Sequence, residues 1–140
     1  INELIGDIVK TVEKNGVELI IKEKNTIQTS GRQIQLKRAF NNIIDNSQRY
    51  AKKIQIILYT NEKDCVIDFN DDGEGIPRDK YEDVFKPFFT LDPSRNKLKG
   101  ESGLGLTITR DIIRSHGGDV KLSASDLGGL QLKVLLPLWF

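Results

Sequence analysis

Apolar residues recur at helical spacing in three segments of the chain. The longest, residues 31–50, carries an apolar stripe formed by Leu36, Ala39, Phe40, Ile43 and Ile44. Shorter stripes occur in residues 1–15 and 104–116, and glycine follows or closes each of them. Because such spacing places apolar side chains on one helical face, and glycine commonly terminates a helix, the pattern predicts three helices.

β-branched and apolar runs between these segments predict strands. The longer runs are residues 17–24, 53–60, 65–70, 120–124 and 130–136, and residues 27–30 form a shorter one. Polar turns separate the second run from the third and the fourth from the fifth, which is typical of hairpins. Hairpins that are mixed with helices, rather than alternating singly with them, favour an α+β fold. We expect a two-layer sandwich with one mixed sheet covered on one face by about three helices.

Composition narrows the class of protein. The chain has 140 residues, which is the size of a single domain, so we treat residues 1–140 as one unit. Its net charge of +1 gives no electrostatic case for binding nucleic acid or a membrane surface. The single cysteine, Cys65, excludes a disulfide framework and favours a reducing compartment. Since the chain begins at Ile1 and contains no methionine, we expect it to be a piece of a longer polypeptide.

Two asparagines on the longest predicted helix are candidate metal ligands. Asn42 and Asn46 are four residues apart and therefore share a face. Their amide oxygens are hard ligands of the kind that Mg²⁺ accepts. The alternative is that the two asparagines simply belong to a solvent-exposed polar face of the helix. Arg49 and Tyr50 follow within one turn, where a cation could meet phosphate and a phenol ring could pack against a nucleoside.

A glycine-rich loop follows the strand that ends near Asp71. Gly73 and Gly75 would allow a ligand to approach the backbone and would permit positive φ. The Asp71 carboxylate could accept a hydrogen bond from the exocyclic amine of adenine. A plain Asp-Gly turn remains the alternative. The loop is not a dinucleotide-binding fingerprint, because Arg78 occupies the position of the third glycine.

A second glycine-rich loop leads into the helix predicted over residues 104–116. Glycines at a helix start expose backbone N–H groups at the positive end of the helix dipole, which suits phosphate. No lysine follows Gly105, so the segment is not a Walker loop. A flexible loop joined to a helix cap is the alternative interpretation.

Together these motifs resemble the ATP-binding catalytic domain of sensor histidine kinases, within the GHKL superfamily that also includes gyrase B subunits. The matching segments are residues 42–50 (N box), 71–75 (first glycine box), 85–89 (Phe box), 103–106 (second glycine box), and 116–118 with 128–129 (closing glycines). The resemblance implies the Bergerat-type ATP-binding fold, with ATP and Mg²⁺ as cofactors.

The resemblance also implies roles for individual residues. Asn46, helped by Asn42, would hold magnesium; Asp71 would contact adenine; residues 90–102 would form a mobile lid. The implied catalytic residues are Asn42, Asn46 and Arg49. The implied nucleotide-binding residues are Asn46, Arg49, Tyr50, Asp71, Gly73, Gly75, Ile76, Phe88, Ser102, Gly103, Leu104, Gly105 and Leu106.

The implied activity is transfer of the γ-phosphoryl group of ATP to a histidine on the dimerisation domain of the same kinase. A response regulator would then receive it. The domain would be cytoplasmic, monomeric as a fragment, and part of a homodimeric parent. Its one histidine, His116, lies at a predicted helix C-terminus and is expected to cap carbonyls rather than accept phosphate.

Three alternatives stay open. One is an ATPase of the same superfamily, but those enzymes carry a Glu where this chain has Asn42, and an amide cannot act as a general base. Another is a protein-serine kinase of the anti-sigma-factor type, which typically lacks a long lid and the Phe-x-Pro-Phe element found here at residues 85–88. The third is a binding module that has lost catalysis.

Overall fold

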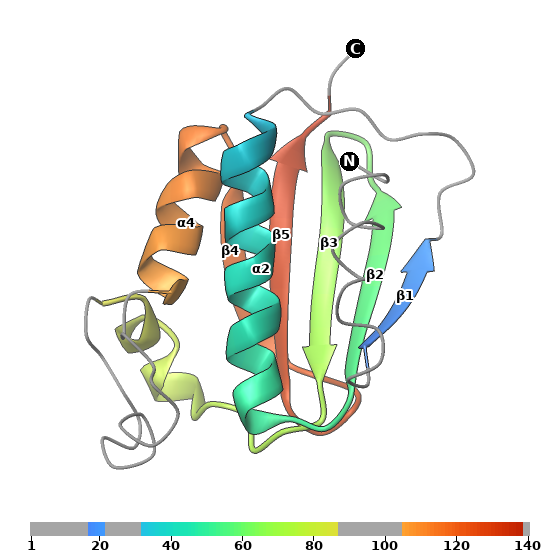
Figure 1. Ribbon diagram of the computed structural model, residues 1–140, viewed down its shortest axis with the longest axis vertical. Coiled ribbons are helices and arrows are strands. Elements are labelled where there is room, and N and C mark those ends of the chain that lie inside the picture. Colours follow the sequence, from blue (N-terminus) through green and yellow to red (C-terminus); the bar gives the residue numbers. More distant parts are fainter. Residues whose placement is uncertain (1–16, 22–31, 87–104, 139–140) are drawn as a thin grey trace.

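The computed structural model has two layers, a sheet and helices that lie across one of its faces (Figure 1). The structure describes residues 17–21, 32–86 and 105–138. The strands of these regions are β1 (Val17–Ile21), β2 (Ile54–Thr60), β3 (Asp64–Asp71), β4 (Asp119–Ala124) and β5 (Leu130–Pro137). The helices are α2 (Gln33–Tyr50) and α4 (Gly105–Ser115), with the 3₁₀ turns η2 (Arg78–Lys80) and η3 (Asp83–Phe85).

The sheet is mixed, as the sequence predicts. Its strand order is β1-β2-β3-β5-β4. Strand β1 pairs parallel to β2, whereas β2–β3, β3–β5 and β5–β4 are antiparallel pairs. Both predicted hairpins are present, and the α+β sandwich is confirmed. The helix predicted over residues 1–15, the short strand at 27–30 and the lid at 90–102 lie outside the described residues.

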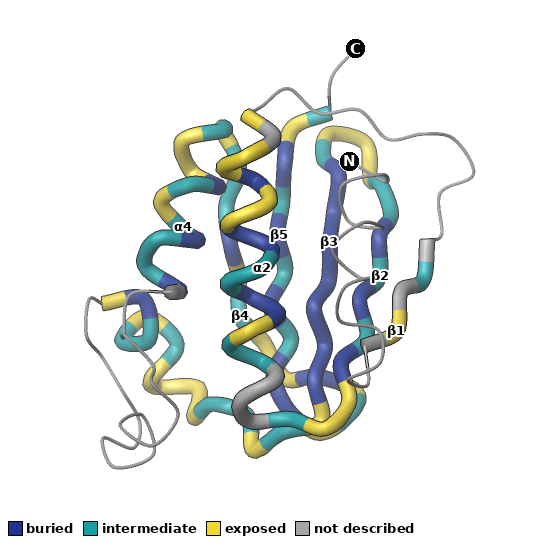
Figure 2. Tube along the Cα trace, in the orientation of Figure 1, coloured by how far each residue is buried: buried dark blue, intermediate teal, exposed yellow. Residues whose placement is uncertain are grey.

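The core lies between the helices and the sheet. The predicted stripe of α2 is buried there, and Phe40 meets Phe69 of β3 with ring centroids 6.2 Å apart. Strand β2 buries alternate residues, as expected for a strand that covers the core with one face. Strand β3, which lies between β2 and β5, is buried along nearly its whole length (Figure 2). Cys65 is fully buried, and burial raises the pKa of its thiol to about 12.

Element boundaries differ from prediction by small amounts. Helix α2 begins at Gln33 rather than Gly31, because Arg32 has an extended backbone with φ −91° and ψ 109°. The 3₁₀ turns η2 and η3 lie outside the three segments that the sequence predicts to be helical. Helix α4 ends at Ser115 and is followed by Gly117, whose φ of +81° favours glycine.

Candidate functional site

The predicted site elements meet at one end of the sandwich. The last turn of α2, the end of β3 and the turn that leads into β5 lie at the same edge of the sheet, near η3 and the start of α4 (Figure 1). Hydrogen bonds connect these segments. Asp72, the residue after β3, accepts from the backbone N–H groups of Lys52 and Lys53 through Oδ1, at 2.9 Å each. The chain that follows α2 is thereby tied to the loop that follows β3.

Asp71 is the last residue of β3 and is buried, with 7% of its surface exposed. Its Oδ1 accepts from the backbone N–H of Gly73 at 3.1 Å and from that of Leu130 at 3.0 Å. Its carbonyl oxygen accepts from the N–H of Gly129 at 3.1 Å. The carboxylate is thus fixed through one oxygen, and both of these donors are backbone groups. This orientation suits a carboxylate that offers its other oxygen to a ligand.

The β4–β5 turn completes the surroundings of Asp71. A Cβ atom at Gly129 would overlap Asp71 Oδ1 and would come within 2.6 Å of the Asp71 carbonyl oxygen and 2.7 Å of the Gly73 nitrogen. Only glycine allows this close approach of the two segments. The sequence identified Gly129 as a closing glycine by resemblance. It did not reveal that Gly129 and Leu130 hold the aspartate, because that contact depends on how β3 pairs with β5.

The sequence suggests positive φ angles for the two glycines of the loop after β3. Of these two, Gly75 has one. Gly75 has φ +74°, in the left-handed region that favours glycine, and it lies against Gly129. Gly73 instead contributes its N–H to Asp71. Ile76 is half-buried beside them. Hydrogen bonds from the Lys53 and Lys52 backbone amides hold the pKa of Asp72 below its usual value, against a smaller opposing effect of desolvation.

The asparagine pair lies on α2. Asn42 and Asn46 are both half-buried and are separated by one helical turn, so they lie on the same side of the helix. Arg49 and Tyr50 form the end of α2, and their side chains lie outside the described part of the structure. In the described regions, no three His, Cys, Asp or Glu side chains form a group that could hold a metal ion. Amide oxygens fit magnesium, which takes few protein ligands and completes its shell with water and phosphate.

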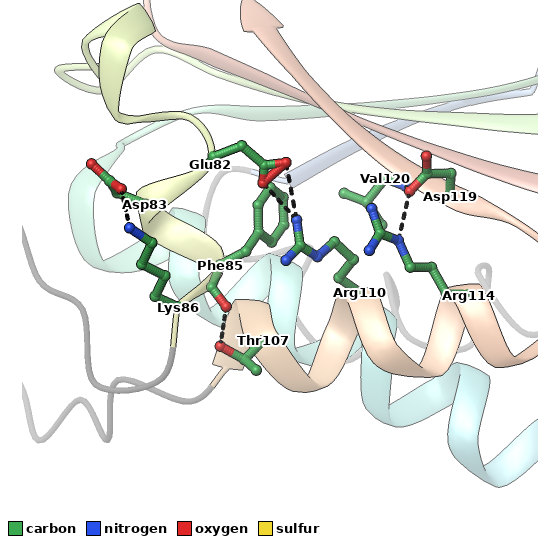
Figure 3. A network of polar contacts seen from close by, with 9 residues as sticks. All are labelled: Glu82, Asp83, Phe85, Lys86, Thr107, Arg110, Arg114, Asp119 and Val120. Carbon is green, nitrogen blue, oxygen red and sulfur yellow. Dashed lines mark hydrogen bonds and ion pairs between the residues drawn. The ribbon is translucent and has the colours of Figure 1, made fainter.

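The glycine-rich segment enters α4 at Gly105. Leu106 is buried, and the hydroxyl of Thr107 donates to the carbonyl oxygen of Phe85 at 2.5 Å. Four other predicted nucleotide-binding residues, Phe88, Ser102, Gly103 and Leu104, lie outside the described residues. The helix start faces the end of η3 (Figure 3). Backbone N–H groups at a helix start and the helix dipole suit an anionic ligand.

His116 follows α4 and has a structural role. Its Nδ1 lies 2.8 Å from the carbonyl oxygen of Ile112, and its Nε2 accepts from the backbone N–H of Arg32 at 2.9 Å. The tautomer that satisfies both contacts carries a proton on Nδ1 and accepts at Nε2. The imidazole caps the end of α4, as predicted, and it also joins that end to the start of α2. Both ring nitrogens are therefore engaged.

Known proteins resemble this chain in sequence. The model of the family described as "Histidine kinase-, DNA gyrase B-, and HSP90-like ATPase" matches residues 31–139. The sensor histidine kinase CpxA of Escherichia coli K12 is 38% identical over 105 residues, which cover 74% of this chain and 23% of CpxA. The sensor histidine kinase GtrS of Pseudomonas aeruginosa is 36% identical over 108 residues, which cover 76% of this chain and 22% of GtrS. The chain thus spans less than a quarter of the length of these relatives.

Solved structures share the fold. The catalytic domain of histidine kinase ThkA superposes with a TM-score of 0.80 at 23% identity, covering 98% of this chain and 91% of that one. The ATP-binding domain of PrrB from Mycobacterium tuberculosis gives a TM-score of 0.75 at 24% identity, covering 99% and 90%. None of the helices that the structure describes is both long and apolar enough to cross a bilayer.

Proposed function

Because the chain belongs to the family of histidine kinase-, DNA gyrase B- and HSP90-like ATPases, we propose that it binds ATP with magnesium and donates the γ-phosphoryl group to a histidine on the dimerisation domain of the same kinase. An aspartate of a response regulator would then accept the group. Since ATP is a cytoplasmic substrate, the domain would work in the cytoplasm. The names of the similar proteins CpxA and GtrS, both sensor histidine kinases, support this choice within the family.

The observation that carries the proposal is the fixed carboxylate of Asp71. Amides of Gly73 and Leu130 hold one oxygen, so the other can accept from the exocyclic amine of adenine without reorganisation. Guanine has a carbonyl oxygen at the corresponding position, which a carboxylate would repel. The adenine end of the site would therefore be formed by β3, the 72–77 loop and the β4–β5 turn.

The phosphate end would be formed by α2 and the start of α4. Asn46 and Asn42 would hold magnesium, with Arg49 near the phosphates. When bound, magnesium neutralises charge on the phosphate oxygens. The backbone N–H groups at the start of α4 would contact the phosphates. Tyr50, Ile76, Phe88, Ser102, Gly103 and Leu104 complete the proposed nucleotide-binding set, together with Gly73, Gly75, Gly105 and Leu106.

Asn42 favours transfer over hydrolysis. An amide has no pKa in the useful range and cannot remove a proton from water. An imidazole nitrogen of the acceptor histidine needs no such base. It would attack the γ-phosphorus while the bond to the β–γ bridging oxygen breaks and ADP leaves. In such a reaction the protein contributes mainly positioning and charge stabilisation.

The test is phosphorylation in trans. The chain is incubated with γ-labelled ATP, with and without magnesium and with and without the helical hairpin of the parent kinase's dimerisation domain. We expect an acid-labile, base-stable label on the hairpin only, and only with magnesium. The chain alone should stay unlabelled, because both ring nitrogens of His116, its only histidine, are engaged.

Other outcomes would contradict the proposal. An acid-labile label on His116 would remove the need for a separate acceptor domain. A label that resists acid would favour a serine kinase, and rapid release of phosphate without any label would favour an ATPase.

A further inference from the structure

One side of α4 carries three polar side chains that face other elements. Thr107, Arg110 and Arg114 follow one another along this side of the helix (Figure 3). Arg114 pairs with Asp119 at the start of β4, at 3.2 Å. The other two contact η3 and the residue before it. Arg110 and Thr107 therefore form a separate connection, which we call the η3 contact.

The η3 contact is centred on Phe85. The guanidinium carbon of Arg110 lies 4.2 Å from the centroid of the Phe85 ring. The same guanidinium donates through Nη1 to Glu82, at 2.9 Å to Oε2 and 3.4 Å to Oε1. Arg110 is mostly buried, with 20% of its side chain exposed, whereas Glu82 is 79% exposed. The stacking on a buried ring is therefore the stronger part of the contact, and the solvated ion pair adds less.

Thr107 anchors the same residue from the first turn of α4. Its hydroxyl donates to the carbonyl oxygen of Phe85, so ring and backbone of Phe85 are both held by α4. Phe85 is 5% exposed and belongs to the core. The start of α4 is thus attached to Phe85, a residue that is itself fixed in the core.

We propose that Arg110 is a positioning residue for the phosphate end of the nucleotide site, because it holds the first turns of α4 against η3. This inference rests on the proposed function. The helix starts at Gly105, and glycine adds backbone freedom at the point where N–H groups would have to be aligned. Side chains lean toward the N-terminus of a helix, so Arg110 acts on the turns that precede it. Holding those turns in place before binding lowers the entropic cost of ordering them around phosphate.

The adenine end does not depend on this contact. Asp71 is held by Gly73, Gly129 and Leu130, none of which belongs to α4 or η3. Loss of the η3 contact should therefore weaken binding of the phosphates and leave binding of the base unchanged. A residue that only stabilises the fold would affect both parts alike or neither.

The experiment compares two ligands in the Arg110→Ala variant of the 140-residue chain. A non-hydrolysable ATP analogue with magnesium is titrated by calorimetry, and adenosine is titrated by NMR chemical shifts. We expect the Kd of the analogue to rise roughly five- to thirtyfold, the range set by loss of a partly desolvated cation–π contact. The Kd of adenosine should change by less than a factor of about two, because the adenine end does not depend on the η3 contact.

Matched variants complete the design. Arg110→Lys keeps a cation near the ring and should recover part of the affinity for the analogue. Glu82→Ala should weaken the analogue less than Arg110→Ala does. Arg114→Ala, which removes an ion pair from the same side of the same helix, should bind both ligands as the unmodified chain does. Melting curves establish that each variant is folded at the titration temperature.

Three results would overturn the inference. The first is an unchanged Kd of the analogue in a folded Arg110→Ala variant. The second is an equal loss of affinity for analogue and adenosine, which would assign Arg110 a purely structural role. The third is failure of the unmodified chain to bind the analogue, which would remove the proposed function and this inference together.

Discussion

At the scale of single residues, the proposed adenine contact depends on how Asp71 is held. A carboxylate that is free to rotate would have to be ordered by its ligand. Two backbone donors, from Gly73 and Leu130, do this beforehand. These donors come from opposite directions along the chain, one from the loop after β3 and one from the first residue of β5. The acceptor oxygen is therefore positioned by the fold itself.

Gly129→Ala tests this arrangement. The added methyl group would overlap Asp71 Oδ1 and would have to displace the aspartate. We expect a loss of about 1–3 kcal/mol in the free energy of unfolding. The affinity for ATP should fall roughly tenfold or more, because a charged hydrogen-bond acceptor is misplaced. Urea unfolding and calorimetric titration measure the two effects.

The neighbouring glycine provides the control. Gly128 has φ +101°, but no atom lies within 4 Å of the position of its Cβ. Gly128→Ala should therefore cost about 1–2 kcal/mol of stability through backbone strain and leave the affinity for ATP unchanged. Equal affinities in the two variants would show that the β4–β5 turn does not hold the adenine contact.

The sequence indicated candidate site residues more readily than the residues that support them. Asp71 and the asparagine pair could be recognised because their side chains and spacing suggest a ligand. Leu130 could not, because it acts through a backbone amide that every residue except proline possesses. Arg110 was also missed, since nothing in the sequence indicates that its guanidinium stacks on Phe85.

At the scale of elements, the end of α4 is fixed by its two glycines. The N–H of Gly117 donates to Arg114 and that of Gly118 to Ile113, each at 3.0 Å, which satisfies carbonyls left open by the helix end. A Cβ at Gly118 would overlap the carbonyl oxygen of Leu135 in β5. The helix end thus lies directly against the sheet, and His116 connects it to the start of α2.

Gly118→Ala should be among the most damaging single substitutions in the described regions. The methyl group meets backbone rather than a side chain that could rotate away, so the helix end must move. We expect a loss of about 3 kcal/mol or more in the free energy of unfolding. This is the upper end of the range that is typical when an added group overpacks a core. A melting temperature equal to that of the unmodified chain would contradict this packing.

Helices α2 and α4 and both hairpins were predictable because their patterns are local. The stripe of α2 and the alternation in β2 each lie within one segment. The parallel pairing of β1 with β2 was not predictable, since α2 separates the two strands in the chain. The start of α2 was not predictable either, since the backbone N–H of the extended residue Arg32 donates to Nε2 of His116, 84 residues away.

At the scale of the whole molecule, the carboxylates of Asp72, Asp83 and Asp119 make the stability of the fold depend on pH in the acid range. Hydrogen bonds from the Lys53 and Lys52 amides lower the pKa of Asp72, and the Lys86 ammonium lowers that of Asp83. For Asp119, burial acts to raise the pKa, but the Val120 amide and the Arg114 guanidinium together lower it. The folded state therefore favours the charged form of each group.

The sign of the effect follows from these shifts. Stability from a lowered pKa is present above the unfolded value, 3.8 for aspartate, and is lost as the pH falls through the lower folded value. Because solvent screens the charges of Asp72 and Asp83, we expect only a modest fall in the melting temperature below about pH 4. Asp72→Asn should show a shallower decline, because the variant has one fewer such group. Identical slopes for the variant and the unmodified chain would exclude a contribution from Asp72.

The central claim is that this end of the sandwich binds ATP through Asp71, and calorimetric titration of Asp71→Asn with ATP and magnesium tests it most directly. The variant retains a side-chain oxygen for the Gly73 and Leu130 amides, so the fold should survive. Replacing a charged acceptor with a neutral one should weaken binding by about 1–3 kcal/mol, roughly 5- to 150-fold. Unchanged affinity together with an unchanged melting curve would contradict the assignment.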